Sequence, residues 1–172
     1  MQIISGKYQR RSLKYPKNRL FRPTKSMVRE AVFSIIGKRI LDATFLDLCS
    51  GSGAVGLEAE SRGAATVICV DKDTRYLKQN KDLLQADIHI VRSDACRFLK
   101  KTTQMFDIIY FDPVWADFDT YKDGLNTIFS RQLLNDNSIL IIEHDKTLSI
   151  ASLVPIPISK QSNYGNSIIS IF

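Results

Sequence analysis

The stretch that decides the fold of this chain is Thr44-Phe45-Leu46-Asp47-Leu48-Cys49-Ser50-Gly51-Ser52-Gly53-Ala54-Val55-Gly56. Residues 44–48 are mostly β-branched, aromatic or aliphatic, which favours a strand buried on both faces, as in a parallel sheet covered by helices. Gly51 and Gly53 then allow a tight bend and a close approach of the backbone to a ligand. A helix over 54–62 follows, and its free N-terminal amides face the bend. The stretch therefore predicts a strand, a ligand-binding turn and a helix.

Two classes of ligand fit this turn. Read literally, residues 51–56 match the G-x-G-x-x-G dinucleotide fingerprint, in which the helix start holds a pyrophosphate. Asp47 argues against that ligand, because a carboxylate repels pyrophosphate and attracts a cation such as the sulfonium of S-adenosylmethionine. Asp71 follows the next predicted strand, where an acid takes ribose hydroxyls in either class. The turn thus indicates a nucleoside cofactor and favours S-adenosylmethionine; the alternative is a plain turn with a solvated aspartate.

The composition indicates one soluble globular domain. The chain has 172 residues, of which 44% are hydrophobic and 24% are charged, enough for one buried core and too few for two ordinary domains. No apolar run approaches membrane-spanning length, and the N-terminus lacks a signal-peptide pattern. We therefore expect a cytoplasmic, monomeric protein that contacts no membrane.

The cysteines and histidines give no sign of a metal site or a hydrolase. Cys49, Cys69 and Cys96 are widely spaced and nothing resembles C-x-x-C, so we expect neither a disulfide nor a metal site. His89 and His144 have no partner at metal-ligand spacing, and neither lies beside a nucleophile motif. The sequence therefore favours chemistry that needs no metal and no Ser/His/Asp or Cys/His arrangement.

Positive charge is concentrated at the N-terminus. The net charge is +6, but residues 1–39 hold eleven Lys or Arg and one acid, whereas the rest of the chain is net negative. A solvated basic face is the ordinary reading of such a run. Aromatic and turn residues are interleaved here, which favours binding to a nucleic-acid backbone. The basic side chains expected to contact the nucleic acid are Lys7, Arg10, Arg11, Lys14, Arg22 and Arg29.

The chain is expected to have two parts. Residues 1–39 are predicted to form a basic RNA-binding arm, ordered around Gly6, and a helix that Thr24 can cap. One apolar face of that helix should pack on the main body and leave Arg29 available elsewhere. Residues 40–172 are predicted to form the S-adenosylmethionine-binding domain.

The second part alternates strands and helices, which predicts an α/β, Rossmann-like fold whose seven-stranded sheet is mostly parallel. The tail, with prolines and then a Tyr164-Gly165 turn, is expected to add an antiparallel hairpin at the sheet edge. The strands before the tail are expected at 44–48, 66–70, 88–91, 106–111 and 139–143. The helices of this part are expected at 54–62, 74–85, 96–101 and 121–134.

Four aspartates follow four predicted strands: Asp47, Asp71, Asp94 and Asp112. In an open α/β sheet, ligands bind outside the carboxyl ends of the strands, so these side chains should face one crevice. A capping or turn aspartate is the ordinary explanation for any one of them. Four at successive strand ends are hard to obtain by chance, and the pattern predicts a single binding site.

The predicted strand 106–111 delivers Asp112-Pro113-Val114-Trp115 into this crevice. An exocyclic amine on a base is a poor nucleophile because its lone pair is delocalised into the ring. Asp112 and the carbonyl of Pro113 could accept its two N–H bonds and favour a more tetrahedral nitrogen, with proline fixing the backbone. Trp115 could stack on an extruded base, worth about 1–3 kcal/mol. The pattern indicates amine methylation; a turn with a core tryptophan is the alternative.

These motifs resemble those of class I S-adenosylmethionine methyltransferases that modify exocyclic amines. Segments 3–8, 22–24, 28–33, 56–64 and 164–167 extend the resemblance over nearly the whole chain, to the family of bacterial 16S rRNA guanine-N2 methyltransferases that modify guanine 966. The resemblance implies methylation of small-subunit rRNA, free or in the assembling subunit. Val114 stands where this family usually has a second proline, and Trp115 replaces the commoner tyrosine.

The resemblance also assigns roles to residues. It implies that the cofactor is held by Asp47, Ser50, Gly51, Ser52, Gly53, Asp71 and Asp94, and the target base by Asp112, Pro113 and Trp115. Nothing in residues 112–115 distinguishes one purine from the other. Three alternatives therefore stay open: an amino-methyltransferase acting on adenine or DNA, an RNA-binding relative without turnover, and a dinucleotide oxidoreductase, for which no hydride-transfer residues are visible.

Overall fold

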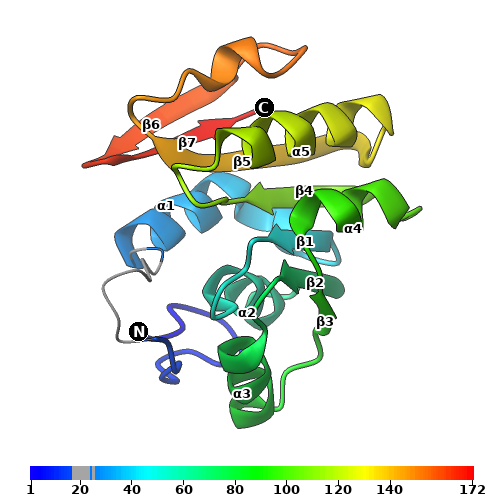
Figure 1. Cartoon of the computed structure of the whole chain (residues 1–172). Helices are drawn as coiled ribbons and strands as arrows, with labels where there is room; N and C mark the ends of the chain where they lie inside the picture. Colours follow the sequence, from blue (N-terminus) through cyan, green and yellow to red (C-terminus); the bar gives the residue numbers. More distant parts are fainter. Residues whose placement is uncertain (17–23, 25) are drawn as a thin grey trace.

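The computed structural model describes residues 1–16, 24 and 26–172 (Figure 1). The strands are β1 (Thr44–Leu48), β2 (Thr66–Asp71), β3 (His89–Arg92), β4 (Phe106–Phe111), β5 (Leu134–Asp145), β6 (Lys160–Tyr164) and β7 (Ser167–Ile171), and the central ones are apolar runs. The α-helices are α1 (Ser26–Ile36), α2 (Ala54–Ser61), α3 (Arg75–Leu84), α4 (Ala95–Lys101) and α5 (Phe118–Ser130), with short 3-10 helices at Gly37–Ile40 and Ile150–Ser152.

The strands form one sheet in the order β3-β2-β1-β4-β5-β7-β6. Strands β1 to β5 pair in parallel, and β7 runs antiparallel to both β5 and β6. The predicted fold class is therefore confirmed, including the antiparallel hairpin at the C-terminal edge. Because β1 lies between β2 and β4, its carboxyl end meets the ends of both neighbours at one edge of the sheet.

Helices cover both faces of the sheet, and the side chains alternate between two cores (Figure 1). Phe45, Ile108 and Ile141 pack on the face covered by α1, α2 and α3. Leu46, Ile109 and Ile142 pack on the face covered by α4 and α5. The continuous apolar character of the central strands follows from this burial on both faces.

The elements around α5 differ from the sequence prediction. The helix spans Phe118–Ser130 rather than residues 121–134, because the side chain of Asp117 accepts the amide of Thr120 and caps it earlier. Gln132, with φ 52°, ends the helical region. Strand β5 therefore starts at Leu134 and is longer than the predicted segment 139–143. The Asp117-x-x-Thr120 pattern was the signal for this start.

The N-terminal arm, residues 1–16, folds back on itself and packs against α2. Gln2 and Ser12 form an antiparallel bridge, and the amides of Lys7 and Tyr8 donate to the carbonyl and hydroxyl oxygens of Ser61. Ile3, Tyr8 and Leu13 are buried in the same core as α1 and β1. The arm is thus ordered, as the pattern around Gly6 predicted, and its buried side chains belong to the core of the main body, which was not predicted.

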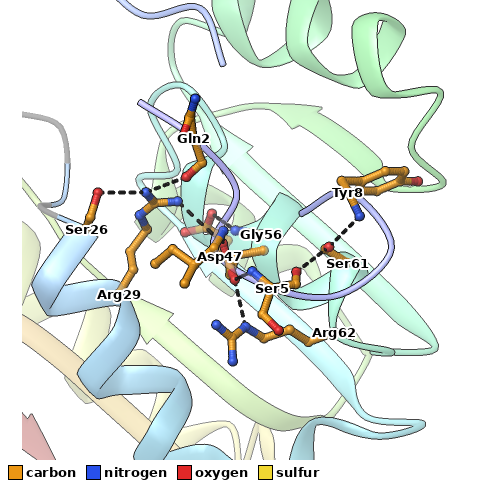
Figure 2. Close-up of polar contacts among 11 residues, drawn as sticks. Gln2, Ser5, Tyr8, Ser26, Arg29, Asp47, Gly56, Ser61 and Arg62 are labelled. Atoms are coloured by element: carbon orange, nitrogen blue, oxygen red, sulfur yellow. Dashed lines mark hydrogen bonds and ion pairs between the residues drawn. The ribbon is translucent and has the colours of Figure 1, made fainter. Parts of the chain in front are cut away.

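A buried carboxylate fixes the arm to α2. Glu58 accepts the amides of Ile4 (2.7 Å) and Ser5 (3.0 Å) and pairs with Arg62 (2.7 Å) and Arg29 (3.6 Å). The Arg29 guanidinium also donates to the carbonyl of Gln2 (2.8 Å) (Figure 2). The side chains of Glu58 and Arg29 are both fully buried. One residue of α2 therefore joins the arm, α1 and the end of α2.

No helix in residues 1–16, 24 and 26–172 has the length and apolar character needed to cross a bilayer.

Replacing Glu58 by glutamine should strongly destabilise the protein. Arg29 would keep a buried positive charge without its partner, and removing one member of a buried pair costs about 3–5 kcal/mol. Urea unfolding measures the loss. The matched control is Glu30→Gln, which changes an exposed residue of α1 and should cost less than about 0.5 kcal/mol. Equal, small losses in both variants would contradict the structural role assigned to Glu58.

Candidate active site

A cavity of about 570 Å³ lies at the carboxyl ends of the strands, within the range of roughly 300–1,000 Å³ typical of cofactor sites. It is lined by all four aspartates that the sequence placed at strand ends: Asp47, Asp71, Asp94 and Asp112. The turn after β1 and the segment after β4 meet in it, because β1 and β4 are neighbours in the sheet. The crevice predicted from the strand ends is thus present.

The turn after β1 is left-handed at several positions. Gly51 has φ 54° and Gly53 has φ 80°. Cys49, whose backbone conformation the sequence analysis did not predict, also has positive φ. A Cβ on Gly53 would lie 2.1 Å from Leu77 of α3, so this glycine is required by packing as well as by conformation. The third glycine, Gly56, packs its backbone against β2, where a Cβ would lie 2.3 Å from the sulfur of Cys69.

Asp47 forms a hydrogen bond with the first turn of α2. Its carboxyl oxygen Oδ2 accepts the amide of Gly56 at 2.8 Å, and the residue is 1% exposed. Its pKa is raised to about 7, chiefly by burial; the Gly56 amide opposes the shift and the negative charge of Asp71 adds to it. The sequence interpretation treated Asp47 only as an attractor of a cation; the structure shows that it also anchors the helix behind the turn.

Asp71 and Asp94 have structural contacts of their own on the cavity wall. Asp71 accepts the amides of Gly51 (2.7 Å) and Asp73 (2.8 Å). Asp94 caps α4 by accepting the amide of Arg97, and its ion pair with Lys72 (2.8 Å) lowers its pKa. Each carboxylate keeps acceptor sites beyond these bonds, since a carboxylate offers about four. Both can therefore hold ligand hydroxyl or amine groups while they order the backbone.

The segment 112–115 leaves β4 at the cavity edge. The amide of Asp112 donates to the carbonyl of Leu48 on β1, which ties this segment to the turn. The side chain of Val114 is 76% exposed, whereas that of Trp115 is partly buried against the cavity. Pro113, whose carbonyl is expected to accept the target amine, thus lies in the chain between Asp112, whose backbone is bonded to β1, and the partly buried Trp115.

Tyr121 is a supporting residue that the sequence analysis missed. Its hydroxyl lies 3.2 Å from the carbonyl oxygen of Pro113 and 2.8 Å from that of Glu143, so it links the end of β4 to the end of β5. Burial, with the nearby charges of Asp112 and Glu143, raises its pKa well above the ordinary value. A carbonyl oxygen has two lone pairs, so that of Pro113 can still accept a second donor. A tyrosine among the apolar positions of α5 was the available signal, since a buried phenol needs a polar partner.

The polar residues of the cavity wall that were not predicted include a hydrogen-bonded cluster of Tyr110, Glu143 and Ser167. Both hydroxyl groups donate to the carboxyl of Glu143, which is 5% exposed. They come from β4, β5 and β7, three strands far apart in sequence, so no local motif could reveal the cluster.

The basic residues of the arm divide into exposed and buried ones. Lys7, Arg10, Arg11 and Lys14 are exposed, with Lys7 paired to Glu60. The guanidinium of Arg11 donates to the carbonyl of Leu83 on α3. These four side chains remain accessible to a polyanion.

The remaining two predicted contacts have different outcomes. Arg22 lies outside the described residues. The prediction for Arg29 is wrong: the residue is 0% exposed and its guanidinium pairs with Glu58 and the Gln2 carbonyl. Burial lowers its pKa, and Glu58 opposes that shift. Its position on α1 faces the arm rather than solvent, so it cannot contact a phosphate.

The arm reaches the cavity through Asn80 of α3. Its side chain accepts the amide of Lys14 (2.7 Å) and donates to the carbonyls of Lys14 (2.8 Å) and Ser52 (2.9 Å). Pro16 and Thr24 line the cavity. The exposed basic residues and the glycine-rich turn are thus connected by one buried side chain.

Among residues 1–16, 24 and 26–172 there is no group of three His, Cys, Asp or Glu side chains that could hold a metal ion. Cys49, Cys69 and Cys96 are all free thiols.

Comparison with known proteins points to a single family. Residues 1–172 match the family model described as Conserved hypothetical protein 95. The chain is 35% identical over 153 residues to ribosomal RNA small subunit methyltransferase D of Buchnera aphidicola subsp. Acyrthosiphon pisum (strain APS), covering 86% of this chain and 80% of that protein. It is 32% identical over 149 residues to the protein of the same name from Escherichia coli (strain K12), covering 84% and 75%.

The fold comparison agrees with the sequence comparison. The solved structure of the "putative methyltransferase yhhF" of Escherichia coli matches with a TM-score of 0.87 at 28% identity, covering 99% of this chain and 96% of that one.

Asp47→Asn should change how stability depends on pH. The native carboxyl titrates near pH 7 and an unfolded aspartate near about pH 4, so the native state binds more protons between these values. The contribution of Asp47 to the free energy of unfolding is therefore largest at low pH and falls as the pH rises from about 4 to about 7, by at most on the order of 4 kcal/mol. Asparagine can still accept the Gly56 amide but does not ionise, so the variant should gain stability relative to the parent chain over this window.

Urea unfolding of both chains between about pH 4 and about pH 8 gives this difference directly. Asp82→Asn, which changes an exposed carboxyl of α3, is the matched control. A difference between Asp47→Asn and the parent chain that stays constant across the window would show that the carboxyl is not buried as described.

Proposed function

The chain belongs to the family described as Conserved hypothetical protein 95, as its sequence resemblance predicted, and from this membership we propose that it methylates the exocyclic N2 amine of a guanine in small-subunit rRNA. Relatives named as small-subunit rRNA methyltransferases support the methyl transfer and the rRNA substrate. The more specific part of the proposal is that the methylated atom is N2 of the guanine that corresponds to guanine 966. The main structural support for methyl transfer to an amine is that the glycine-rich turn and the segment 112–115 line the same cavity.

The cavity residues fit S-adenosylmethionine. Ser50, on the wall, has a buried hydroxyl oxygen without a hydrogen-bond partner among the described residues, which a polar ligand would satisfy. The turn of residues 50–53 would hold the methionine part beside Asp47, Asp71 would accept the ribose hydroxyls and Asp94 would accept from the adenine. When bound, this cofactor supplies an electrophilic methyl group.

The target amine would be oriented by Asp112 and Pro113. The carboxylate of Asp112 and the carbonyl of Pro113 would accept the two N–H bonds, so that the nitrogen lone pair is directed into the cavity. Trp115 would stack on the base and hold its plane. Rate enhancement then comes chiefly from positioning, with the nitrogen held about 3–3.5 Å from the carbon that it attacks.

The arm would bind the rRNA backbone. Lys7, Arg10, Arg11 and Lys14 are exposed and lie on a segment fixed to α2 and α3. An ordered arm presents its charges at constant positions relative to the cavity, which suits a folded RNA substrate. A monomeric state and action in the cytoplasm, where ribosomal subunits assemble, complete the proposal.

The direct test is to identify the methylated nucleotide. Small-subunit particles that lack the modification, incubated with the protein and methyl-labelled S-adenosylmethionine, should yield N2-methylguanosine at one position. Asp112→Ala should lower the rate by about 100-fold or more, whereas Asp119→Ala, an exposed change in α5, should not.

Other outcomes would indicate a different function. Formation of N6-methyladenosine would show that the substrate is adenine and not guanine. RNA binding without any methyl transfer would show that the protein is an RNA-binding relative that lacks turnover.

The arm proposal predicts a change in salt dependence. Replacing Arg10 and Arg11 together by alanine should remove about two phosphate contacts and so reduce the slope of log affinity against log salt by about 1.5. Affinity for S-adenosylhomocysteine should not change. The matched control replaces Lys100 and Lys101, two exposed basic residues in the last turn of α4, on the face of the sheet that the arm does not cover. An unchanged slope in the arm variant would mean that the arm is only solvated.

A further inference from the structure

Two acids stand at equivalent positions where the pairing of β4 and β5 ends. The register pairs Tyr110 with Ile141 and Phe111 with Ile142, so Asp112 and Glu143 follow the last pair of these two strands. The side chain of Glu143 lies on the face that carries Tyr110 and Ile141, since the hydroxyl of Tyr110 donates to its carboxyl. Both acids line the cavity. The proposed amine acceptor therefore shares the cavity wall with a second carboxyl.

Two hydroxyl groups hold the Glu143 carboxyl in place. The hydroxyl of Tyr110 donates to Oε2 at 2.5 Å, and that of Ser167 donates to Oε1 at 2.6 Å. The donors come from the strands on either side of β5, so the carboxyl is fixed from both sides. Each oxygen keeps a further acceptor site, since a carboxylate offers about four.

The sheet does not require a carboxyl at this position, although the cluster joins three of its strands. A buried carboxyl costs free energy unless it is well hydrogen-bonded, and apolar side chains fill the same face at the preceding positions, Ile139 and Ile141. An acceptor that is buried, oriented and directed at a ligand cavity is what recognition of a donor on a ligand requires.

Guanine and adenine differ at the ring atom beside the amine. In guanine the ring nitrogen N1 next to the 2-amine carries a hydrogen and is a donor. In adenine the N1 next to the 6-amine carries a lone pair and is an acceptor. A fixed acceptor placed beside the group that holds the amine therefore attracts guanine and repels adenine.

We propose that Glu143 is the specificity-determining residue that accepts the N1–H of the target guanine while Asp112 accepts an N–H of its amine. This inference rests on the proposed function, since it assigns purine choice within the same cavity. It supplies the discrimination that residues 112–115 alone lack. Tyr110 and Ser167 are positioning residues, because they act through the Glu143 carboxyl.

The probe is 2-aminopurine, which keeps the 2-amine of guanine but has a lone pair at N1. Small-subunit particles are reconstituted on rRNA that carries guanine or 2-aminopurine at the target position, introduced by ligation. The parent protein should methylate guanine with a kcat/KM at least about 100-fold higher, because a site built to accept an N–H rejects an analogue that lacks it.

Glu143→Gln should reduce this preference at least tenfold and raise the rate on 2-aminopurine, because the amide nitrogen can donate to a bare N1 and to one of the two hydroxyl oxygens while the amide oxygen accepts from the other hydroxyl. Glu30→Gln, on the surface of α1, is the matched control and should leave the preference unchanged.

The outcomes separate the inference from the function on which it rests. Equal rates of the parent protein on the two bases would overturn the role of Glu143, and this result needs no variant to fold. A preference that Glu143→Gln leaves intact, in a variant that still binds S-adenosylhomocysteine, would also overturn it. A parent protein that methylates neither base at the 2-amine would refute the proposed function itself, and the inference with it.

Discussion

The hydrogen bond from the Gly56 amide to the buried carboxyl of Asp47 fixes the start of α2, and the rest of the site depends on where that helix begins. The same short helix carries Glu58, which binds the arm amides and Arg29. One end of α2 therefore sets the geometry of the glycine-rich turn, and its middle sets the position of the basic arm. Because a Cβ at position 56 would collide with the sulfur of Cys69, the close approach of α2 to β1 and β2 depends on the glycine at this position.

The electrostatics of the molecule follow from this arrangement. Carboxyl groups from four strand ends line one cavity, and their mutual repulsion is visible in Asp47, whose pKa is raised by burial and then by Asp71. A cationic ligand would relieve that repulsion, whereas a pyrophosphate would increase it. The exposed basic residues lie outside the cavity, on the arm. The negative side chains therefore line the cavity, where a small cation would bind, and the positive side chains lie on the arm, where a polyanion would bind.

The sequence predicted what depends on local pattern, and it failed where partners are distant. Alternating elements and aspartates at strand ends are encoded within a few residues, so the sheet and the crevice could be predicted. Arg29 was misread because a basic residue on an amphipathic helix resembles a surface residue until Glu58, about thirty residues away, is placed beside it. Glu143 and its hydroxyl donors went unnoticed for the same reason, since three non-consecutive strands bring them together.

The link through Asn80 argues for a rigid relation between the arm and the cavity. Its amide group bonds the backbone of Lys14 in both directions and also the Ser52 carbonyl, and the side chain is fully buried. A flexible basic tail would raise the local concentration of RNA without orienting it. In the proposed function, an arm bonded to the glycine-rich turn would instead set the distance between bound phosphates and the segment 112–115, so that only a base at a defined place in a folded RNA would enter. The selection of one nucleotide among many identical ones would then follow from geometry outside the cavity, and the choice between purines from the groups within it.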